Sequence, residues 1–110
     1  AAGDRLASAV EAVFPDLGMA DGRFRVALLS REEPGVTGAE DVEFRAALNL
    51  GHDARALARV ASGGELSRVM LALKTILARL DRVPTLVFDE VDAGIGGRVG
   101  LMVGETMRRV

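Results

Sequence analysis

The chain has 110 residues with 14 basic and 16 acidic side chains, and 49% of the residues are hydrophobic. This length suits one small domain or part of a larger one, and the hydrophobic content predicts a globular core rather than disorder. The absence of cysteine excludes disulfide scaffolds and cysteine-based zinc sites. No apolar run approaches the roughly 18 residues of a membrane span, and the arginines form no continuous basic run that would predict nucleic-acid binding by this segment alone.

The first part of the chain predicts one helix. Apolar side chains recur at helical spacing over residues 4–14, from Leu6 to Phe14, and we expect Pro15 to end the helix. The sequence begins without methionine and without the basic and apolar regions of a signal peptide. We therefore expect the chain to be cut from a longer, intracellular protein.

Two stretches of alternating apolar and polar residues follow, at 23–29 and 42–48. Each pattern predicts a strand with one face exposed to water. The polar residues 30–41 contain proline and glycines and predict a loop, across which the two strands pair antiparallel. Residues 49–59 are ambiguous, with a turn at Gly51.

The second half predicts a helix, a strand and a helix, which makes the fold class α/β. An apolar stripe spans residues 63–81 and predicts a helix. Ser62 and Glu65, at the beginning of this helix, have the spacing of a capping box. The apolar run 85–88 predicts a short strand buried on both faces. Residues 98–110 predict a closing helix.

The first motif that carries chemistry is Ala61–Glu65, at the beginning of the long helix. The first N–H groups of a helix lack partners inside the helix and lie at the positive end of its dipole. Glycines there allow a phosphate to approach the backbone, and the hydroxyl of Ser62 adds a donor. The alternative interpretation is that Ser62 only caps the helix and the glycines only form a turn.

The second motif is the pair Asp89 and Glu90, at the end of the predicted buried strand. Ligands of open α/β sheets bind beyond the carboxyl ends of the strands. A carboxylate there can hold Mg²⁺ directly or through water, and an adjacent carboxylate can orient and deprotonate an attacking water. The alternative is a polar strand end that enters an acidic turn.

The order of the two motifs resembles the signature and Walker B motifs of ABC-type ATPases. The run VASGGELSRVMLALK at residues 60–74 and the run VFDEVDAGIGG at residues 87–97 are similar to RecN, a family of SMC-like bacterial DNA repair proteins. The specific match covers residues 58–104, and weaker similarity extends to residues 42–44 and 17–19. The resemblance implies the C-terminal lobe of an ABC/SMC-type ATPase head.

In that family ATP is held between two heads, so the resemblance implies ATP hydrolysis coupled to head dimerisation in DNA double-strand break repair and recombination. Asp89 would support Mg²⁺ through water in the head's own site, and Glu90 would be the catalytic carboxylate that positions water. The residues that would contact the γ-phosphate of ATP held by the partner head are Ser62, Gly63, Gly64 and Glu65.

The glycine-rich segment 91–97 would be the D-loop, which communicates across the dimer through Gly94 and Gly96. ABC proteins commonly carry Asp where this chain has Gly96, so a role of that Asp cannot be transferred to the glycine. Asp92 lies nearby, and whether it takes over that role is left open.

Two parts of a complete ATPase site are missing from the sequence. No P-loop motif occurs, because Lys74 is the only lysine and lies inside the predicted long helix. No histidine follows the Asp89–Glu90 pair where the family has a switch histidine, and we interpret His52 as a loop or surface residue. The resemblance implies that the chain's own N-terminal Walker A lobe lies elsewhere in the protein, and that this segment alone is inactive.

The resemblance divides the chain into three regions and implies its partners. Residues 1–20 would be the exit of a coiled coil with its connection, residues 21–60 a hairpin with a linker, and residues 61–110 the part that carries both motifs. The partners would be the Walker A lobe, a second identical head and DNA, without a membrane. The protein would be cytoplasmic and associated with the nucleoid.

Three alternatives differ in class. A dinucleotide site would use Gly94, Gly96 and Gly100, but the carboxylates of Asp89 and Glu90 would repel a pyrophosphate there. A nucleotide-gated dimerisation or interaction module would use the same motifs without efficient turnover, which retention of Glu90 argues against. The third alternative is the head of another SMC or ABC family member.

Overall fold

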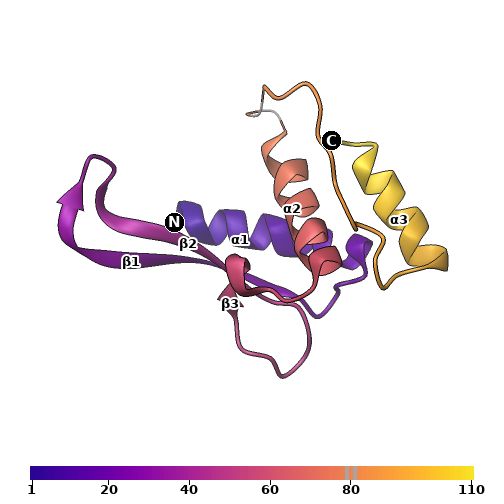
Figure 1. Ribbon diagram of the computed structural model, residues 1–110, viewed down its shortest axis with the longest axis horizontal. Coiled ribbons are helices and arrows are strands. Elements are labelled where there is room, and N and C mark those ends of the chain that lie inside the picture. Colours follow the sequence, from indigo (N-terminus) through magenta and orange to yellow (C-terminus); the bar gives the residue numbers. More distant parts are fainter. Residues whose placement is uncertain (79, 81) are drawn as a thin grey trace.

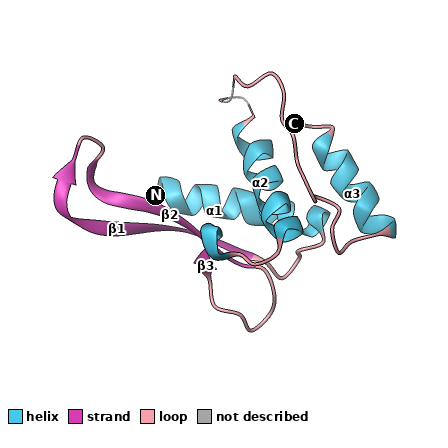
Figure 2. Cartoon of the chain, in the orientation of Figure 1, coloured by secondary structure: helices cyan, strands magenta, loops and turns pink. Residues whose placement is uncertain are grey.

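The computed structural model describes every residue of the chain except 79 and 81. The molecule is flat, with extents of 49 × 37 × 23 Å. A long two-stranded hairpin projects from one end, and the helices gather at the other end, where a loop-like segment passes between the last two of them (Figure 1). Figure 2 shows the same arrangement by element type, with a single small sheet and helices on one side of its base.

The first helix, α1 (Ala2–Val13), lies within two residues of the predicted bounds and leads into the 3-10 helix η1 (Phe14–Leu17). Pro15 has no backbone N–H, so the α-helical ladder ends before it. The chain nevertheless continues as a 3-10 turn where we expected a plain connection. Val10 and Phe14 are fully buried, as their helical spacing predicts.

The sheet is antiparallel and has the order β1-β2-β3, with bounds Arg23–Gly35, Gly38–Ala47 and Arg55–Ala56. The predicted antiparallel pairing is confirmed, with Val26 opposite Phe44. The phenyl rings of Phe24 and Phe44 lie 5.5 Å apart between centroids, on the face that packs toward the helices. The alternating pattern therefore places the sheet correctly against the core.

The prediction of a loop over residues 30–41 was wrong. The strands continue to Gly35 and Gly38, and the register shifts between Ser30 and Gly35. Every residue of this distal part is exposed, so no alternation of buried and exposed side chains marks the strands in the sequence. Pro34 is tolerated because β1 is an edge strand of the sheet.

The long helix, α2 (Gly63–Leu77), begins where predicted, and the hydroxyl of Ser62 accepts a hydrogen bond from the backbone N–H of Glu65 at 3.3 Å. The predicted helix reached residue 81, and residues 79 and 81 lie outside the described part of the chain. Val69 and Leu73 of the predicted stripe are buried. Leu66 and Leu77 of the stripe are half-buried, Met70 and Ile76 are exposed, and the exposed Leu80 lies beyond the end of α2.

The predicted buried strand at residues 85–88 does not form in the structure. The segment runs as an irregular chain between α2 and the last helix (Figure 2). Leu86 and Phe88 are half-buried, whereas the side chain of Val87 is 88% exposed. A strand buried on both faces needs a hydrogen-bonded neighbour, and the three strands of the described chain pair only with one another.

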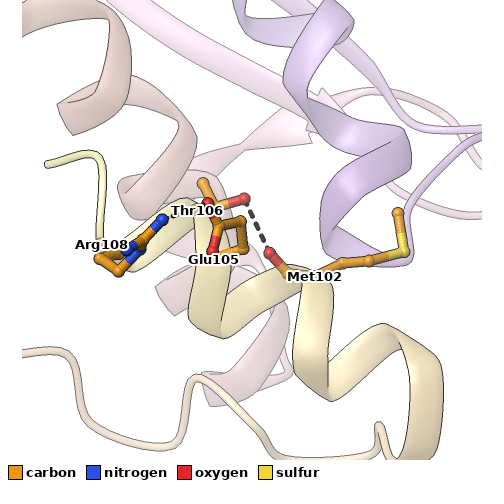
Figure 3. Close-up of polar contacts among 4 residues, drawn as sticks. All are labelled: Met102, Glu105, Thr106 and Arg108. Atoms are coloured by element: carbon orange, nitrogen blue, oxygen red, sulfur yellow. Dashed lines mark hydrogen bonds and ion pairs between the residues drawn. The ribbon is translucent and has the colours of Figure 1, made fainter.

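The last helix, α3 (Gly97–Met107), ends three residues before the predicted bound. Val103 and Thr106 are buried, as predicted, while Val110 lies beyond the helix and is 38% exposed. The Thr106 hydroxyl donates to the backbone carbonyl of Met102 at 3.0 Å, so this buried hydroxyl is paired (Figure 3).

One hydrophobic core joins α1, η1, the base of the hairpin, α2 and α3. Because its members come from both halves of the sequence, the hairpin and the two motif-bearing segments share one interior. The core consists of Val10, Phe14, Leu17, Met19, Phe24, Ala46, Leu48, Val69, Leu71, Ala72, Leu73 and Val103.

Candidate functional site

The beginning of α2 presents free backbone donors. Ser62 is the N-cap residue and occupies the N–H of Glu65, while the Glu65 carboxylate lies 3.4 Å from the amide nitrogen of Asn49. No acceptor within the described chain is recorded for the N–H groups of Gly63 and Gly64. The capping role of Ser62 is confirmed, and anion binding by the N–H groups of Gly63 and Gly64 stays a prediction, because one hydroxyl satisfies only one of the first donors.

Gly64 is required by close packing against the turn at residues 90–93. A Cβ atom on Gly64 would lie 2.8 Å from the Cβ of Ala93 and 3.0 Å from the backbone oxygen of Glu90. Real Cβ contacts are essentially never that short, so any side chain there would push the helix and the turn apart. The glycine thus has a packing reason within a single chain.

Glu90 stands at the junction of the two motifs. Its carboxylate lies beside Gly63, where a Cβ atom would come within 2.0 Å of Oε2. Its backbone has a φ of 55°, the only left-handed value among non-glycine residues in the described part of the chain. The carbonyl of Glu90 accepts a hydrogen bond from the N–H of Ala93 at 2.9 Å, which closes the turn. A residue held in this sparsely populated region is over-determined by its surroundings and is often functional.

Asp89 and the predicted D-loop glycines lie on either side of this turn. Asp89 is exposed and borders a hollow between α2 and residues 86–89, together with Gly63. Gly94 has a φ of 73°, which favours glycine, whereas Gly96 has extended backbone that any residue adopts. Asp92 is exposed in the same loop.

Magnesium could be held here only with help from outside the described chain. No group of three or more His, Cys, Asp or Glu side chains that could hold a metal occurs among the described residues. Mg²⁺ in nucleotide sites is bound through one or two carboxylates, several waters and substrate phosphates. The single carboxylate of Asp89 fits that pattern of few protein ligands.

Arg68 is a site residue that the sequence did not reveal. It lies one turn after Gly64 on α2 and is only 5% exposed. Its guanidinium donates from one nitrogen to the carbonyls of Val91 at 3.2 Å and Ala93 at 2.8 Å, while its Nε is buried without a partner. The arginine therefore ties α2 to the turn that follows Glu90. The one available signal was its position, four residues after Gly64 on the buried face of the helix.

Comparison with known proteins finds similarity to DNA repair protein RecN of several bacteria. DNA repair protein RecN of Treponema pallidum is 51% identical over 105 residues, which cover 90% of this chain and 18% of that protein. The chain resembles RecN over nearly its whole length. RecN of Streptomyces coelicolor is 41% identical over 99% of the chain, and RecN of Deinococcus radiodurans is 46% identical over 96%. No protein-family model matches the chain.

The RecN-like chain has the fold of part of an SMC head. It superimposes with a TM-score of 0.56 on the crystal structure of an SMC head bound to the C-winged helix domain of ScpA, at 23% identity, over 98% of this chain and 33% of that one. The chain spans about a fifth of the length of the curated relatives, 18% and 21% for the two first named. Within the described residues, no helix is long and apolar enough to cross a bilayer.

Proposed function

We propose that the protein carrying this chain binds and hydrolyses ATP, and that hydrolysis is coupled to dimerisation of its heads during DNA double-strand break repair. The observation that carries the proposal is the direct packing of the two motifs. Gly64 permits the beginning of α2 to touch the turn of Glu90, and Arg68 holds the same turn through two carbonyls. The similarity to RecN supports the choice of reaction and of DNA repair as its setting.

The beginning of α2 would bind the γ-phosphate of ATP held by the partner head. The exposed Gly63 and the half-buried Ser62 face solvent at the helix N-terminus. The N–H groups of Gly63 and Gly64 would donate to phosphate oxygens, and the helix dipole would favour their negative charge. Glu65 would hold the first turn in place through its contact with Asn49.

Asp89 and Glu90 would act in the head's own site. Mg²⁺ bound with the help of Asp89 would neutralise charge on the phosphate oxygens. Glu90 would orient the attacking water and accept its proton at a carboxylate oxygen. The carboxylate of Glu90 lies beside Gly63, at the beginning of α2.

The remaining parts of the ATPase site would come from outside this chain. The Walker A lobe of the same protein would supply the P-loop. Its strands would also pair with the backbone of residues 85–88, which has no neighbouring strand in the described chain. The second head would meet the loop of Gly94 and Gly96, and Asp92 or its neighbours would communicate across that interface. We propose a cytoplasmic location at the nucleoid, with DNA as the further partner.

The test is ATP turnover by the full-length protein against its Glu90→Gln variant. We expect wild-type turnover to rise faster than linearly with protein concentration, and the variant to bind ATP while turnover falls at least 100-fold, about 3 kcal/mol in the barrier. The amide keeps the size of the side chain but cannot accept the proton. Normal turnover in the variant would remove Glu90 from this role, and no wild-type turnover even with DNA would favour a nucleotide-gated interaction module.

A further inference from the structure

The charges of the sheet are separated along its length. Acidic side chains outnumber basic ones at the tip of the hairpin, where residues 32–33 and 40–41 are acidic and Arg31, which pairs with Asp41, is basic. Basic side chains collect at its base, where the sheet joins the helices. We call this second group the arginine face, and it consists of Arg23, Arg25, Arg45 and Arg59. The near-zero net charge of the chain hides this separation, because the four arginines come from three parts of the sequence.

The register of the strands places like charges side by side. Arg25 of β1 lies directly opposite Arg45 of β2, so the two side chains share one face of the sheet. Phe24 and Ala46, the next residues along, are buried on the other face. Like charges directly opposite each other in a sheet are destabilising, unless an anion offsets them. Glu43 offsets the charge of Arg45, and no carboxylate of the described chain is recorded as a partner of Arg25.

The arginine face continues onto the 3-10 helix η2 (Leu57–Arg59), which follows the short edge strand β3. Arg55 of β3 lies opposite Ala46, so it belongs to the other face and borders this surface from the edge of the sheet. Arg45, Arg55 and Arg59 line one shallow hollow on this surface. Its single acidic residue is Glu43, which pairs with Arg45 at 2.5 Å. No carboxylate within the described chain is recorded as a partner of Arg25, Arg55 or Arg59, which leaves a net positive surface.

The side chains point to a phosphate backbone as the binding partner. A guanidinium is planar and always charged, and it matches phosphate oxygens through two parallel N–H donors. Alternate residues of a strand, such as Arg23 and Arg25, project on one face about 7 Å apart, which suits neighbouring phosphates of one nucleic-acid strand. A rigid sheet also positions such contacts without ordering a loop.

We propose that the arginine face binds the phosphate backbone of duplex DNA. The proposal rests on the proposed function only in taking DNA as the partner of the intact protein. The surface does not include the turn of Glu90, so DNA contact there leaves the attacking water unobstructed. Its Arg59 end borders the beginning of α2, because Arg59, Ser62 and Glu65 line one hollow. Because phosphate contacts carry no sequence information, binding at this face is independent of DNA sequence.

The experiment measures binding of a labelled duplex to the full-length protein without ATP, over a range of salt concentrations. The double variant Arg25→Gln, Arg59→Gln is compared with wild type and with Arg108→Gln, Arg109→Gln, which removes the same charge from exposed residues at the end of α3. We expect the first pair to weaken binding on the order of ten-fold per lost phosphate contact near 0.1 M salt, and to lower the salt slope by about 2. The control pair should retain the wild-type slope, as should Arg25→Lys, Arg59→Lys.

Several outcomes would overturn the proposal. An unchanged slope in the glutamine pair, an equal loss in the control pair, or no duplex binding by wild-type protein each excludes the arginine face as a DNA surface. If the glutamine pair instead changes self-association and leaves DNA binding intact, the face binds the acidic hairpin tip of a second copy. ATP turnover without DNA is measured alongside for Arg25→Gln alone, and it should be unchanged, because Arg25 does not border the beginning of α2 whereas Arg59 does. Loss of turnover in Glu90→Gln with DNA binding intact separates this proposal from the ATPase proposal.

Discussion

The hairpin and the segment at residues 85–88 are both extended chains, yet only the hairpin is paired. β1 and β2 satisfy each other's backbone groups over most of their length, including an exposed part where no side chain is buried. Residues 85–88 are more apolar but form no ladder, and Val87 is largely exposed. Strand formation in this molecule thus follows the supply of a neighbouring backbone, not the apolar content of the segment.

The unpaired residues 85–88 are positioned by the turn that follows them, at residues 90–93. The turn at residues 90–93 is closed by its own hydrogen bond and attached to α2 through Arg68 and Gly64. The carboxylates of Asp89 and Glu90 therefore depend on contacts with α2 for their position. Breaking those contacts should affect the site strongly, whereas breaking a contact in the distal hairpin should affect it weakly.

The largest effect is expected for Arg68→Ala. The substitution leaves the carbonyls of Val91 and Ala93 without their donor and removes a buried side chain, so we expect a loss of about 2–4 kcal/mol in the free energy of unfolding. Denaturant unfolding of the purified protein measures this loss. Ser67→Ala, at the preceding half-buried position, is the control and should stay within about 0.5 kcal/mol of wild type.

The same variant tests whether Arg68 holds the turn. Hydrogen exchange at the N–H of Ala93, which is bonded to the carbonyl of Glu90, should become faster in Arg68→Ala. Arg68→Lys keeps the charge and one terminal nitrogen, but its amine is not held in place by a planar guanidinium, so it should restore protection only in part. Unchanged protection in a folded Arg68→Ala protein would show that the turn is held by other contacts.

An intermediate effect is expected for Gly64→Ala. The added Cβ would lie 2.9 Å from the backbone oxygen of Ala93, which cannot move aside as a side chain can. We expect a loss of about 1–3 kcal/mol in the free energy of unfolding, from the usual cost of overpacking, together with a fall in ATP turnover. Both are measured on the same preparation.

Gly100→Ala is the matched control, because an added Cβ in α3 meets nothing within 4 Å. Alanine is the better helix former by about 0.8–1 kcal/mol, so this variant should be slightly more stable than wild type. If both alanine variants behaved alike, close approach to the turn would not be the reason for glycine at position 64.

The sequence predicted those features that neighbouring residues determine. The alternation from Phe24 to Val26 placed β1, and the spacing of Ser62 and Glu65 placed the beginning of α2, because a cap and a strand face are local properties. The distal hairpin was missed because its pairing buries nothing and so leaves no pattern. The motifs supplied Asp89 and Glu90, whose catalytic and metal-binding roles stay predictions.

The contacts between the motifs could not be predicted from the sequence. A single arginine within an apolar helix is usually solvated, and only the position of the turn shows that Arg68 is buried beneath it. The left-handed backbone of Glu90 could not be predicted from the sequence either, because Gly or Asn usually occupies that region and Glu does not indicate it. Likewise, the arginine face appears only once the register brings Arg25 opposite Arg45.

The smallest effect is expected in the distal hairpin, for Asp41→Asn. The ion pair of Asp41 with Arg31 has an N–O distance of 3.6 Å, and the two side chains are 64% and 34% exposed. Water and salt screen such a pair, so its loss should change the free energy of unfolding by less than about 0.5 kcal/mol and leave ATP turnover unchanged. Unfolding measured at low and at high salt should show the small difference shrinking as salt is added. A loss of unfolding free energy as large as that of Arg68→Ala would mean that the hairpin tip is coupled to the core. The hairpin, which pairs with itself, and residues 85–88, which are held by contacts with α2, would then not differ as argued.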